Sequence, residues 1–434
     1  MSLKKINSFD KSYTEIVNII NPSSYKDLEN KTNESRNFIT IGSNLSYVPA
    51  AFGKNIISIS TNTFNKILYF NQKEKIIIVE SGLKIYELLN FTFKYKLWIP
   101  QIPGYPLITI GGAVAANVHG KNASIFGSIN NSVIGLKIFH KDHGWLNLSN
   151  EKNKEIFDLT IGGFGLTGTI TAITLKLEEI KNFFFETNIE EVKSVEESIE
   201  KINTCNKENF LYSLNFLSLN KKVNSNGLLL REKSIDLKNI LNTETIFKPQ
   251  KKIEISIWNQ YSIKLLNRFL LYFFKFKKKK VKSIYSVLFP YYGKEYYFSF
   301  FGRKGFLESQ ILVDFEKVDD FLREFENLVI FFKPFIVFFS VKRNSGKHLF
   351  LRFEGNKINI AFDLVKNKNS ILFLNSLYKV YIKLNIIPSI IKDSNLDLET
   401  FNKTYIYADQ FRSKLSNFDP KRVYKSELSN KLKL

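Results

Sequence analysis

The sequence predicts an α+β protein with two domains, and three observations support this fold class. Residues 38–180 hold short apolar runs of strand length, such as NFITIG and KIIIVESG, between turns rich in glycine. From about residue 183 to 386, charged helix-like segments alternate with strand-like runs. The 434 residues also exceed what one compact core usually holds. We therefore expect a first domain over residues 1–182, a second α+β domain on an antiparallel sheet over 183–386, and a C-terminal segment over 387–434.

The individual elements follow from the same patterns. In the first domain, SVIGLKIFH and GTITAITLKL predict two more strands, and Lys84–Tyr95 is helix-like. In the second, EEVKSVEESIEKI predicts a helix, whereas YYFSFFG, ESQILV, HLFLRFEG and KINIAFDLV predict strands. From Ile387 onward, KDSNLDLETF and LSNFDPKRVYKSELSNKL predict turns and helices.

The composition argues against a metal centre. Cys205 is the single cysteine, so no intrachain disulfide and no cysteine-based metal site can form. The four histidines do not have the spacing of zinc ligands. We expect His140 and His143 to flank a hairpin turn with solvated side chains. The other two histidines are His119 and His348.

Charge and hydropathy favour a cytoplasmic protein that meets anionic partners. The N-terminus has no signal-like apolar run, and the apolar stretch Phe325–Ser340 is too short and interrupted to span a bilayer. The net charge of +22 favours polyanions. Six lysines follow the aromatic run that ends at Phe274; they are Lys275, Lys277, Lys278, Lys279, Lys280 and Lys282. They form either a solvated loop or a patch on an anionic membrane at its inner face; no nucleic-acid motif accompanies them.

Three glycine-containing stretches lie in the first domain. IGSNLSY follows a strand and suits a turn whose backbone N–H groups bind an anion, but it matches neither the Walker loop nor GxGxxG. TIGGAVAANVHGKN combines glycines with small residues and leaves room for a flat ligand, unless it is only a close helix–strand contact. IGGFGLTGTI fits a β-bulge with a helix cap. Three such stretches in one domain favour a ligand against the backbone.

The order of these stretches resembles the vanillyl-alcohol-oxidase type of FAD domain, and more closely the decaprenylphosphoryl-β-D-ribose 2′-oxidase family. The resemblance rests on the second and third stretches, on FGSINNSV, and on IIKDSNLDLETF and DPKRVYKSELSNKL near the end. It covers residues 38–180 and 386–434 well and the middle only patchily. It implies a PCMH-type FAD-binding domain built from both chain ends, with the α+β substrate domain inserted between them.

The resemblance also implies which residues line the FAD. They are Thr40, Ile41, Gly42, Ser43, Asn44, Leu45, Ser46, Tyr47, Gly104, Thr109, Ile110, Gly111, Gly112, Ala116, Asn117, Val118, His119 and Ile170. The pyrophosphate is expected on the N–H groups of the first stretch. Leu45 occupies the position where some relatives carry a histidine bound to the flavin, so non-covalent FAD is expected.

Two residues are candidates for catalysis. The resemblance places Lys392 beside the flavin and the reacting hydroxyl, where an ammonium group would stabilise the reduced flavin. His119 is the alternative, since a neutral imidazole can accept the hydroxyl proton. Without the resemblance, Lys392 would be read as a surface lysine and His119 as a core residue that orders its loop.

For the substrate, the resemblance implies contacts from Tyr47, Lys121, Gln310, Lys342, Asn359 and Lys392, with Lys342 meeting a phosphate. The chain departs from the family at four positions: Glu308 replaces Gln, Ser389 replaces Tyr, Phe289 replaces His, and Ala361 replaces Cys. These changes leave the identity of the sugar open.

The expected function is oxidation of a secondary hydroxyl on a polyprenyl-phosphate-linked pentose or similar glycosyl lipid, in cell-wall or glycan precursor biosynthesis. FAD takes the hydride, a quinone or another acceptor reoxidises it, and a short-chain reductase completes the epimerisation. The alternatives are a soluble alditol or sugar-lactone oxidase, and a basic membrane- or nucleic-acid-binding protein with a vestigial flavin fold.

Overall fold

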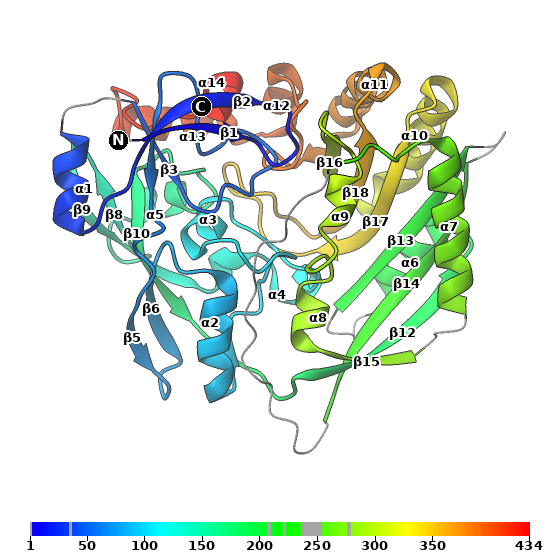
Figure 1. Cartoon of the computed structure of the whole chain (residues 1–434), viewed down its shortest axis with the longest axis horizontal. Coiled ribbons are helices and arrows are strands. Elements are labelled where there is room, and N and C mark those ends of the chain that lie inside the picture. Colours follow the sequence, from blue (N-terminus) through cyan, green and yellow to red (C-terminus); the bar gives the residue numbers. More distant parts are fainter. Residues whose placement is uncertain (1, 34–36, 206–209, 220–222, 237–253, 276–278) are drawn as a thin grey trace.

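The computed structural model describes the chain except residues 1, 34–36, 206–209, 220–222, 237–253 and 276–278. Figure 1 shows two lobes, one formed by the N-terminal strands together with the C-terminal helices, the other by a large twisted sheet with helices packed on it. Within the described residues, no helix is long and apolar enough to cross a membrane. Nor does any group of three or more His, Cys, Asp or Glu side chains there suit a metal ion.

Among the described residues, the N-terminal lobe contains two larger sheets and a short pair of β7 (Leu97–Trp98) with β11 (Glu178–Glu179). The first has the order β1-β2-β4-β3, with β1 (Ser2–Asn7), β2 (Thr14–Ile20), β3 (Phe38–Ile41) and β4 (Ile57–Ser60). The second has the order β5-β6-β10-β8-β9, with β5 (Ile67–Asn71), β6 (Ile76–Glu80), β8 (Val133–His140), β9 (Gly144–Leu148) and β10 (Thr169–Lys176). The core on the second sheet includes Ile77, Ile138 and Ile173 together with residues of helices α2 (Ile85–Thr92) and α3 (Ile110–Ala115).

The second lobe is built on an eight-stranded sheet of the order β15-β12-β14-β13-β17-β18-β16-β19. Its strands are β12 (Phe184–Val192), β13 (Phe210–Leu219), β14 (Val223–Ile235), β15 (Lys279–Ser283), β16 (Phe306–Val313), β17 (Ile336–Asn344), β18 (Lys357–Val365) and β19 (Ile387–Pro388). Neighbouring strands pair antiparallel throughout. The fold is therefore α+β with an antiparallel sheet, as the sequence predicts.

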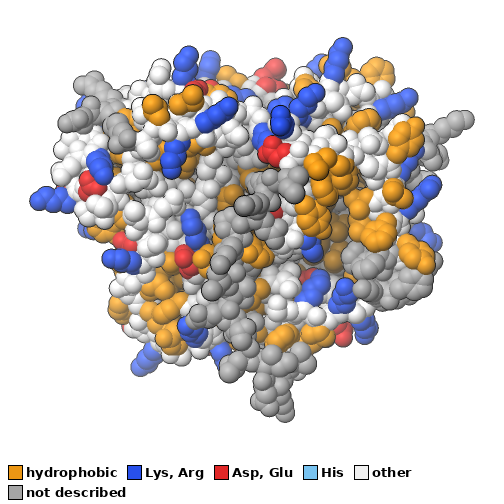
Figure 2. Space-filling model, in the orientation of Figure 1, with side chains coloured by type: hydrophobic (Ala, Val, Ile, Leu, Met, Phe, Trp, Pro, Cys, Tyr) orange, Lys and Arg blue, Asp and Glu red, His pale blue; other side chains and the backbone are white. Residues whose placement is uncertain are grey.

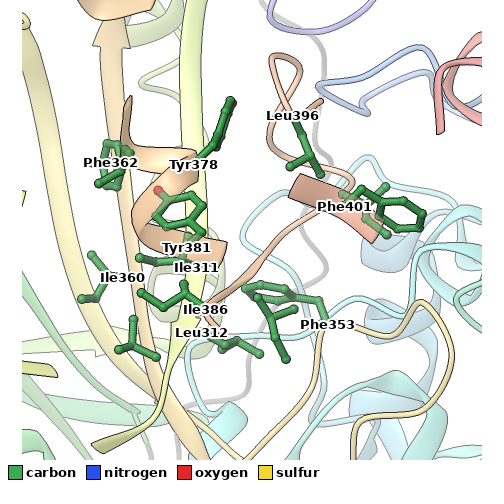
Figure 3. Close-up of a cluster of buried hydrophobic side chains, with 14 of the residues drawn as sticks. Ile311, Leu312, Phe353, Ile360, Phe362, Tyr378, Tyr381, Ile386, Leu396 and Phe401 are labelled. Atoms are coloured by element: carbon green, nitrogen blue, oxygen red, sulfur yellow. The ribbon is translucent and has the colours of Figure 1, made fainter. Parts of the chain in front are cut away.

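The two faces of this sheet differ because successive side chains of a strand alternate in direction. One face is apolar and is covered by α6 (Val195–Thr204), α10 (Val318–Phe332) and α11 (Lys368–Leu384). Figure 3 shows part of this packing, with Ile311, Ile360 and Phe362 against Tyr378 and Tyr381 of α11. The other face carries the polar residues Glu308, Gln310, Lys342, Asn359 and Asp363, and it forms half of the site described below.

The C-terminal segment contacts the first lobe. It contains α12 (Leu398–Thr404), α13 (Ala408–Phe418) and α14 (Glu427–Leu432). Phe38 of β3 bridges to Tyr424, and the Lys425 N–H donates to the Phe38 carbonyl at 2.8 Å. The Glu427 N–H donates to the Phe52 carbonyl at 3.0 Å. Both chain ends therefore build one unit.

Two of the predicted strands are wrong. YYFSFFG contains the short helix α9 (Tyr296–Ser299), because Tyr297 and Phe301 share one side and pack on Trp258. HLFLRFEG is irregular, because its apolar residues pack on separate partners: Phe350 on Phe411 and Phe353 on the His119 ring.

His140 is not solvated but fully buried, with its Nε2 3.5 Å from Asp419 Oδ2. His143, by contrast, is exposed as expected. The burial of His140 follows from its position as the last residue of β8, inside the fold rather than in the turn.

The lysine run is also more ordered than a solvated loop. Lys279–Ser283 forms strand β15 against β12, with Lys282 Nζ 2.9 Å from Glu232 Oε1. Lys277 and Lys278 lie outside the described residues, and so does the side chain of Lys275. At least part of the run is therefore held by strand pairing and an ion pair.

Candidate active site

The first loop, Ile41–Tyr47, leaves β3 and touches the start of α3. A Cβ at Gly42 would overlap the hydroxyl of Thr109, so only glycine allows the two segments to meet. None of the backbone N–H groups of Ser43 to Tyr47 donates to a protein acceptor in the described part of the chain. The loop therefore offers a row of free donors, the arrangement that binds an anion.

The second loop presents its backbone differently. The N–H groups of Ile110 and Gly111 donate to the Leu83 and Ser81 carbonyls, at 2.9 and 2.8 Å. That of Gly112 donates to the Thr109 hydroxyl at 3.2 Å. These donors are already used, so this loop contributes shape rather than hydrogen bonds. Gly112 is exposed, and a Cβ at Gly104 would meet no atom within 4 Å, so space remains beside both glycines.

Lys84, at the start of α2, stands beside the first loop. Its Nζ donates to Ser43 Oγ at 2.9 Å and to Asn62 Oδ1 at 3.1 Å. Burial lowers the pKa of Lys84, although Glu87 opposes this. A cation at this position would be further stabilised by an anion on the loop.

His119 lies between the two lobes. Its ring stacks on Phe353, and its Nε2 is 3.4 Å from the amide nitrogens of both Gln310 and Asn359. Because amide nitrogens only donate, Nε2 acts as an acceptor and the ring proton sits on Nδ1. Burial holds the pKa of His119 well below its ordinary value, and the charges of Lys342 and Lys392 lower it further. His119 is therefore neutral at pH 7.

Lys392 follows β19 in a turn that its neighbour anchors. The buried carboxylate of Asp393 accepts from the Tyr378 hydroxyl at 2.7 Å and from Ser309 Oγ at 2.9 Å. This anchoring places Lys392 Nζ 3.5 Å from the centroid of the Tyr47 ring and 3.6 Å from Glu308 Oε1. The ammonium group thus joins the first loop to the sheet through a cation–π contact and an ion pair.

Glu308 and Asp363 lie directly opposite each other on β16 and β18, and both are buried. Burial raises the pKa of Asp363 well above its ordinary value, and the charge of Glu308 raises it further. Tyr297 donates to Asp363 Oδ2 at 2.7 Å. Asp363 therefore keeps its proton to a higher pH than an exposed aspartate does.

A second group of cations lies farther along the same face. Lys342 on β17 is opposite both Asn359 on β18 and Tyr212 on β13, and Lys121 Nζ is 4.2 Å from the centroid of the Tyr212 ring. Burial lowers the pKa of each lysine to about 7. For Lys342, the charge of Lys392 adds to this effect. Together with Lys392, these lysines form a cationic cluster: Lys121, Lys342 and Lys392.

Comparison with known proteins identifies the N-terminal part of the site. Residues 19–149 match the model of a family described as FAD binding domain. This part of the chain is an FAD binding domain. It contains the first loop, Lys84 and the second loop, so the free N–H groups lie within the part of the chain that matches this family.

The individual proteins to which this chain is similar are also named as oxidases or dehydrogenases. Decaprenylphosphoryl-beta-D-ribose oxidase of Mycolicibacterium smegmatis is 23% identical over 424 residues, which is 92% of this chain and 90% of that protein. L-galactono-1,4-lactone dehydrogenase of Brassica oleracea is 25% identical over 201 residues, 45% of this chain and 33% of that protein. D-lactate dehydrogenase (cytochrome) of Arabidopsis thaliana is 30% identical over 129 residues, 29% of this chain and 23% of that protein. The protein is an FAD-dependent oxidoreductase.

The residues of the FAD binding domain suit the cofactor. Free N–H groups and Lys84 would offer donors and charge to the pyrophosphate, and no atom stands within 4 Å of a Cβ at Gly104, where a flat ring would approach the backbone. Thr40 bonds Thr169 Oγ1 at 3.0 Å, and Ile170 is buried in the core behind the second loop. Leu45 offers no nucleophile for attachment, so non-covalent binding stays the prediction.

The structure brings the expected substrate residues onto one surface. Tyr47 with Lys392, His119 with Gln310 and Asn359, and Lys121 with Lys342 form three adjoining groups. Two of the positions that depart from the family lie at this surface. Glu308 contacts Lys392, and the Ser389 N–H donates to the Gln310 carbonyl at 2.7 Å. Phe289 instead packs in the core of the first lobe.

Sequence reasoning missed Lys84, Tyr212, Tyr297 and Asp363. The alternation in KINIAFDLV puts Asp363 on the same face as Asn359, so that signal was present. Tyr212 and Tyr297 lie far from any motif, and nothing in the sequence marks Lys84 beyond its position before a helix.

Proposed function

We propose that the protein oxidises a secondary hydroxyl of a polyprenyl-phosphate-linked pentose or a similar glycosyl lipid, as the oxidase half of an epimerisation. The observation that carries this proposal is the similarity to a decaprenylphosphoryl-ribose oxidase over 92% of the chain. That span takes in most of the eight-stranded sheet, which supplies the polar face opposite the FAD binding domain. A similarity confined to the FAD binding domain would speak only for the cofactor.

The cationic cluster supports a phosphorylated substrate. Lys121 and Lys342 are half-buried, and burial lowers the pKa of both to about 7 although Glu232 and Glu308 act in the opposite direction. A phosphate between them would restore the charged forms by charge-assisted hydrogen bonds. Lys392, about one third exposed, is the member of the cluster that contacts Tyr47.

The side chains divide the chemistry between them. Bound FAD supplies the hydride acceptor. The Lys392 ammonium, held beside Glu308, would stabilise negative charge that develops on the substrate oxygen. Neutral His119 would accept the hydroxyl proton on Nε2, with Gln310 and Asn359 rotating their amides toward the substrate. The keto sugar would then pass to a short-chain reductase, and a quinone or another acceptor would reoxidise the enzyme.

A soluble alditol or sugar-lactone oxidase is the second candidate, and the partial similarity to plant lactone dehydrogenases favours it. Glu308 also makes the surroundings of the cationic cluster less positive than a glutamine at that position would. Such a substrate carries no phosphate and would leave Lys121 and Lys342 without an ionic partner.

Anaerobic flavin reduction distinguishes the two candidates. Purified holoenzyme is mixed with a short polyprenyl-phosphoryl ribose, with free pentoses and alditols, and with sugar lactones, and the flavin absorbance band is followed. We expect bleaching only with the prenyl-phosphoryl sugar. Bleaching by a lactone or alditol at an equal or higher rate would establish the second candidate instead.

A further inference from the structure

Helix α7 (Gln260–Lys275) has an inner face that covers the site side of the eight-stranded sheet. Ile263 and Leu266 pack in a cluster that also contains Phe306, Tyr47 and Tyr297. Farther along, Leu271 packs with Tyr212 and Leu230. The inner face therefore contacts residues of the site or their immediate neighbours, and α7 lies between the polar face and the outside.

The outer face of α7 is apolar although it faces solvent. Tyr261 is 75% exposed, Leu265 71%, Phe269 58% and Tyr272 67%. Their spacing of four, four and three residues puts them on one side of the helix. Figure 2 shows hydrophobic side chains gathered at the right-hand edge, where Figure 1 places α7. Large apolar side chains clustered in this way usually mark a surface that binds something.

The charges on this face indicate the kind of partner. Lys264 and Arg268 are exposed between the apolar side chains, and α7 contains neither Asp nor Glu. In the adjacent strand β15, Val281 is 57% exposed, and Lys279 points into solvent beyond an ion pair with Glu186 at 3.7 Å. A second copy of this chain would oppose these cations to one another across a two-fold axis. An anionic surface would accept them.

We propose that the outer face of α7 docks the protein on an anionic lipid bilayer. Tyr261, Leu265, Phe269 and Tyr272 would enter the headgroup region, and Lys264 and Arg268 would lie against lipid phosphates. The docking rests on this surface alone. Docking would place the cationic cluster behind α7 next to a substrate carried by the membrane. This purpose rests on the function proposed above.

The test is co-sedimentation of FAD-loaded protein with vesicles of phosphatidylcholine containing about one third phosphatidylglycerol, with pure phosphatidylcholine vesicles alongside. We expect binding to the anionic vesicles that falls at least tenfold in a Tyr261→Ser, Leu265→Ser double variant. A Lys264→Gln, Arg268→Gln variant should lose the dependence on anionic lipid and on salt. Leu3→Ser with Ile16→Ser is the matched control, because these side chains are 71% and 63% exposed on the N-terminal hairpin.

Several outcomes would overturn the proposal: wild-type protein that stays in the supernatant, an α7 double variant that binds as the wild type does, or a control variant that loses binding equally. Dimerisation in light scattering that the α7 variant abolishes, without vesicle binding, would identify a second copy as the partner and also overturn it. Retained FAD content and melting temperature exclude misfolding. The assay contains no substrate, so docking with no oxidation of glycosyl lipid would refute the proposed function alone.

Discussion

The two halves of the site are built from different groups. The first loop offers backbone N–H groups, and a side chain at Gly42 would block the approach of Thr109. The sheet half offers side chains that come from separate strands and from the turn after β19. We therefore expect the loop half to respond to changes of shape and the sheet half to respond to changes of charge.

The largest expected effect comes from Lys392 in the sheet half. Lys392→Ala should retain FAD, because the pyrophosphate donors lie on the first loop, but flavin reduction by substrate should slow by roughly 10²–10³. Lys392→Arg should not restore the rate, since a planar guanidinium does not fit the space between Tyr47 and Glu308 as a compact ammonium does. Anaerobic single-turnover bleaching measures this rate.

His119→Ala separates the two catalytic roles. If His119 accepts the proton, this variant should also be slow, and its rate should lose the dependence on pH that the imidazole imposes. Wild-type bleaching in Lys392→Ala would show that the lysine is a bystander. A slow Lys392→Ala beside a wild-type His119→Ala would assign both roles to the lysine.

The loop half is tested by Gly42→Ala. The added Cβ overlaps the Thr109 hydroxyl, so the two loops must separate, which costs about 1–3 kcal/mol. FAD affinity should fall by about one to two orders of magnitude, measured by fluorescence titration of protein stripped of flavin. Gly104→Ala is the control, since its Cβ meets no atom within 4 Å and should leave the melting temperature of the stripped protein unchanged. Equal FAD affinity in Gly42→Ala and wild type would contradict the assignment of the loop.

A smaller effect concerns how the affinity of the cationic cluster for a phosphate depends on pH. Burial lowers the pKa of Lys342 and Lys121 to about 7, so both are protonated below that pH and lose charge above it. Affinity for a prenyl phosphate should fall about three- to tenfold from pH 6 to pH 8, with proton uptake visible in calorimetry. Lys342→Gln should flatten this dependence. A wild-type affinity that does not change over this range would mean that the phosphate does not bind these lysines.

The same contrast explains what the sequence could predict. The loop half lies in contiguous motifs, because a glycine that lets backbones meet stands next to the donors it exposes. The sheet half is assembled by pairing strands that are far apart in the chain, such as β13 with β17. Alternation along KINIAFDLV identifies a face, but it does not say that Glu308 will stand opposite Asp363. Likewise, the helical α9 and the irregular His348–Gly355 segment follow from partners that no local pattern reveals.

The smallest effect concerns the buried carboxyl pair and appears in stability. The folded state raises the pKa of Asp363 above its ordinary value of 3.8, so the folded protein keeps a proton that the unfolded chain releases. The free energy of unfolding should therefore decline as pH rises from about 4 toward the pKa of Asp363 in the folded protein.

The Asp363→Asn variant tests this dependence. Its amide cannot ionise, and the amide oxygen can still accept from Tyr297. The variant should melt higher than the wild type at neutral pH, and this advantage should shrink toward pH 4. Thermal denaturation across that range is the measurement, with Asp320→Asn, an exposed carboxylate on α10, as the control. An advantage of equal size at pH 4 and pH 7 would show that Asp363 does not titrate in this interval and would contradict this prediction.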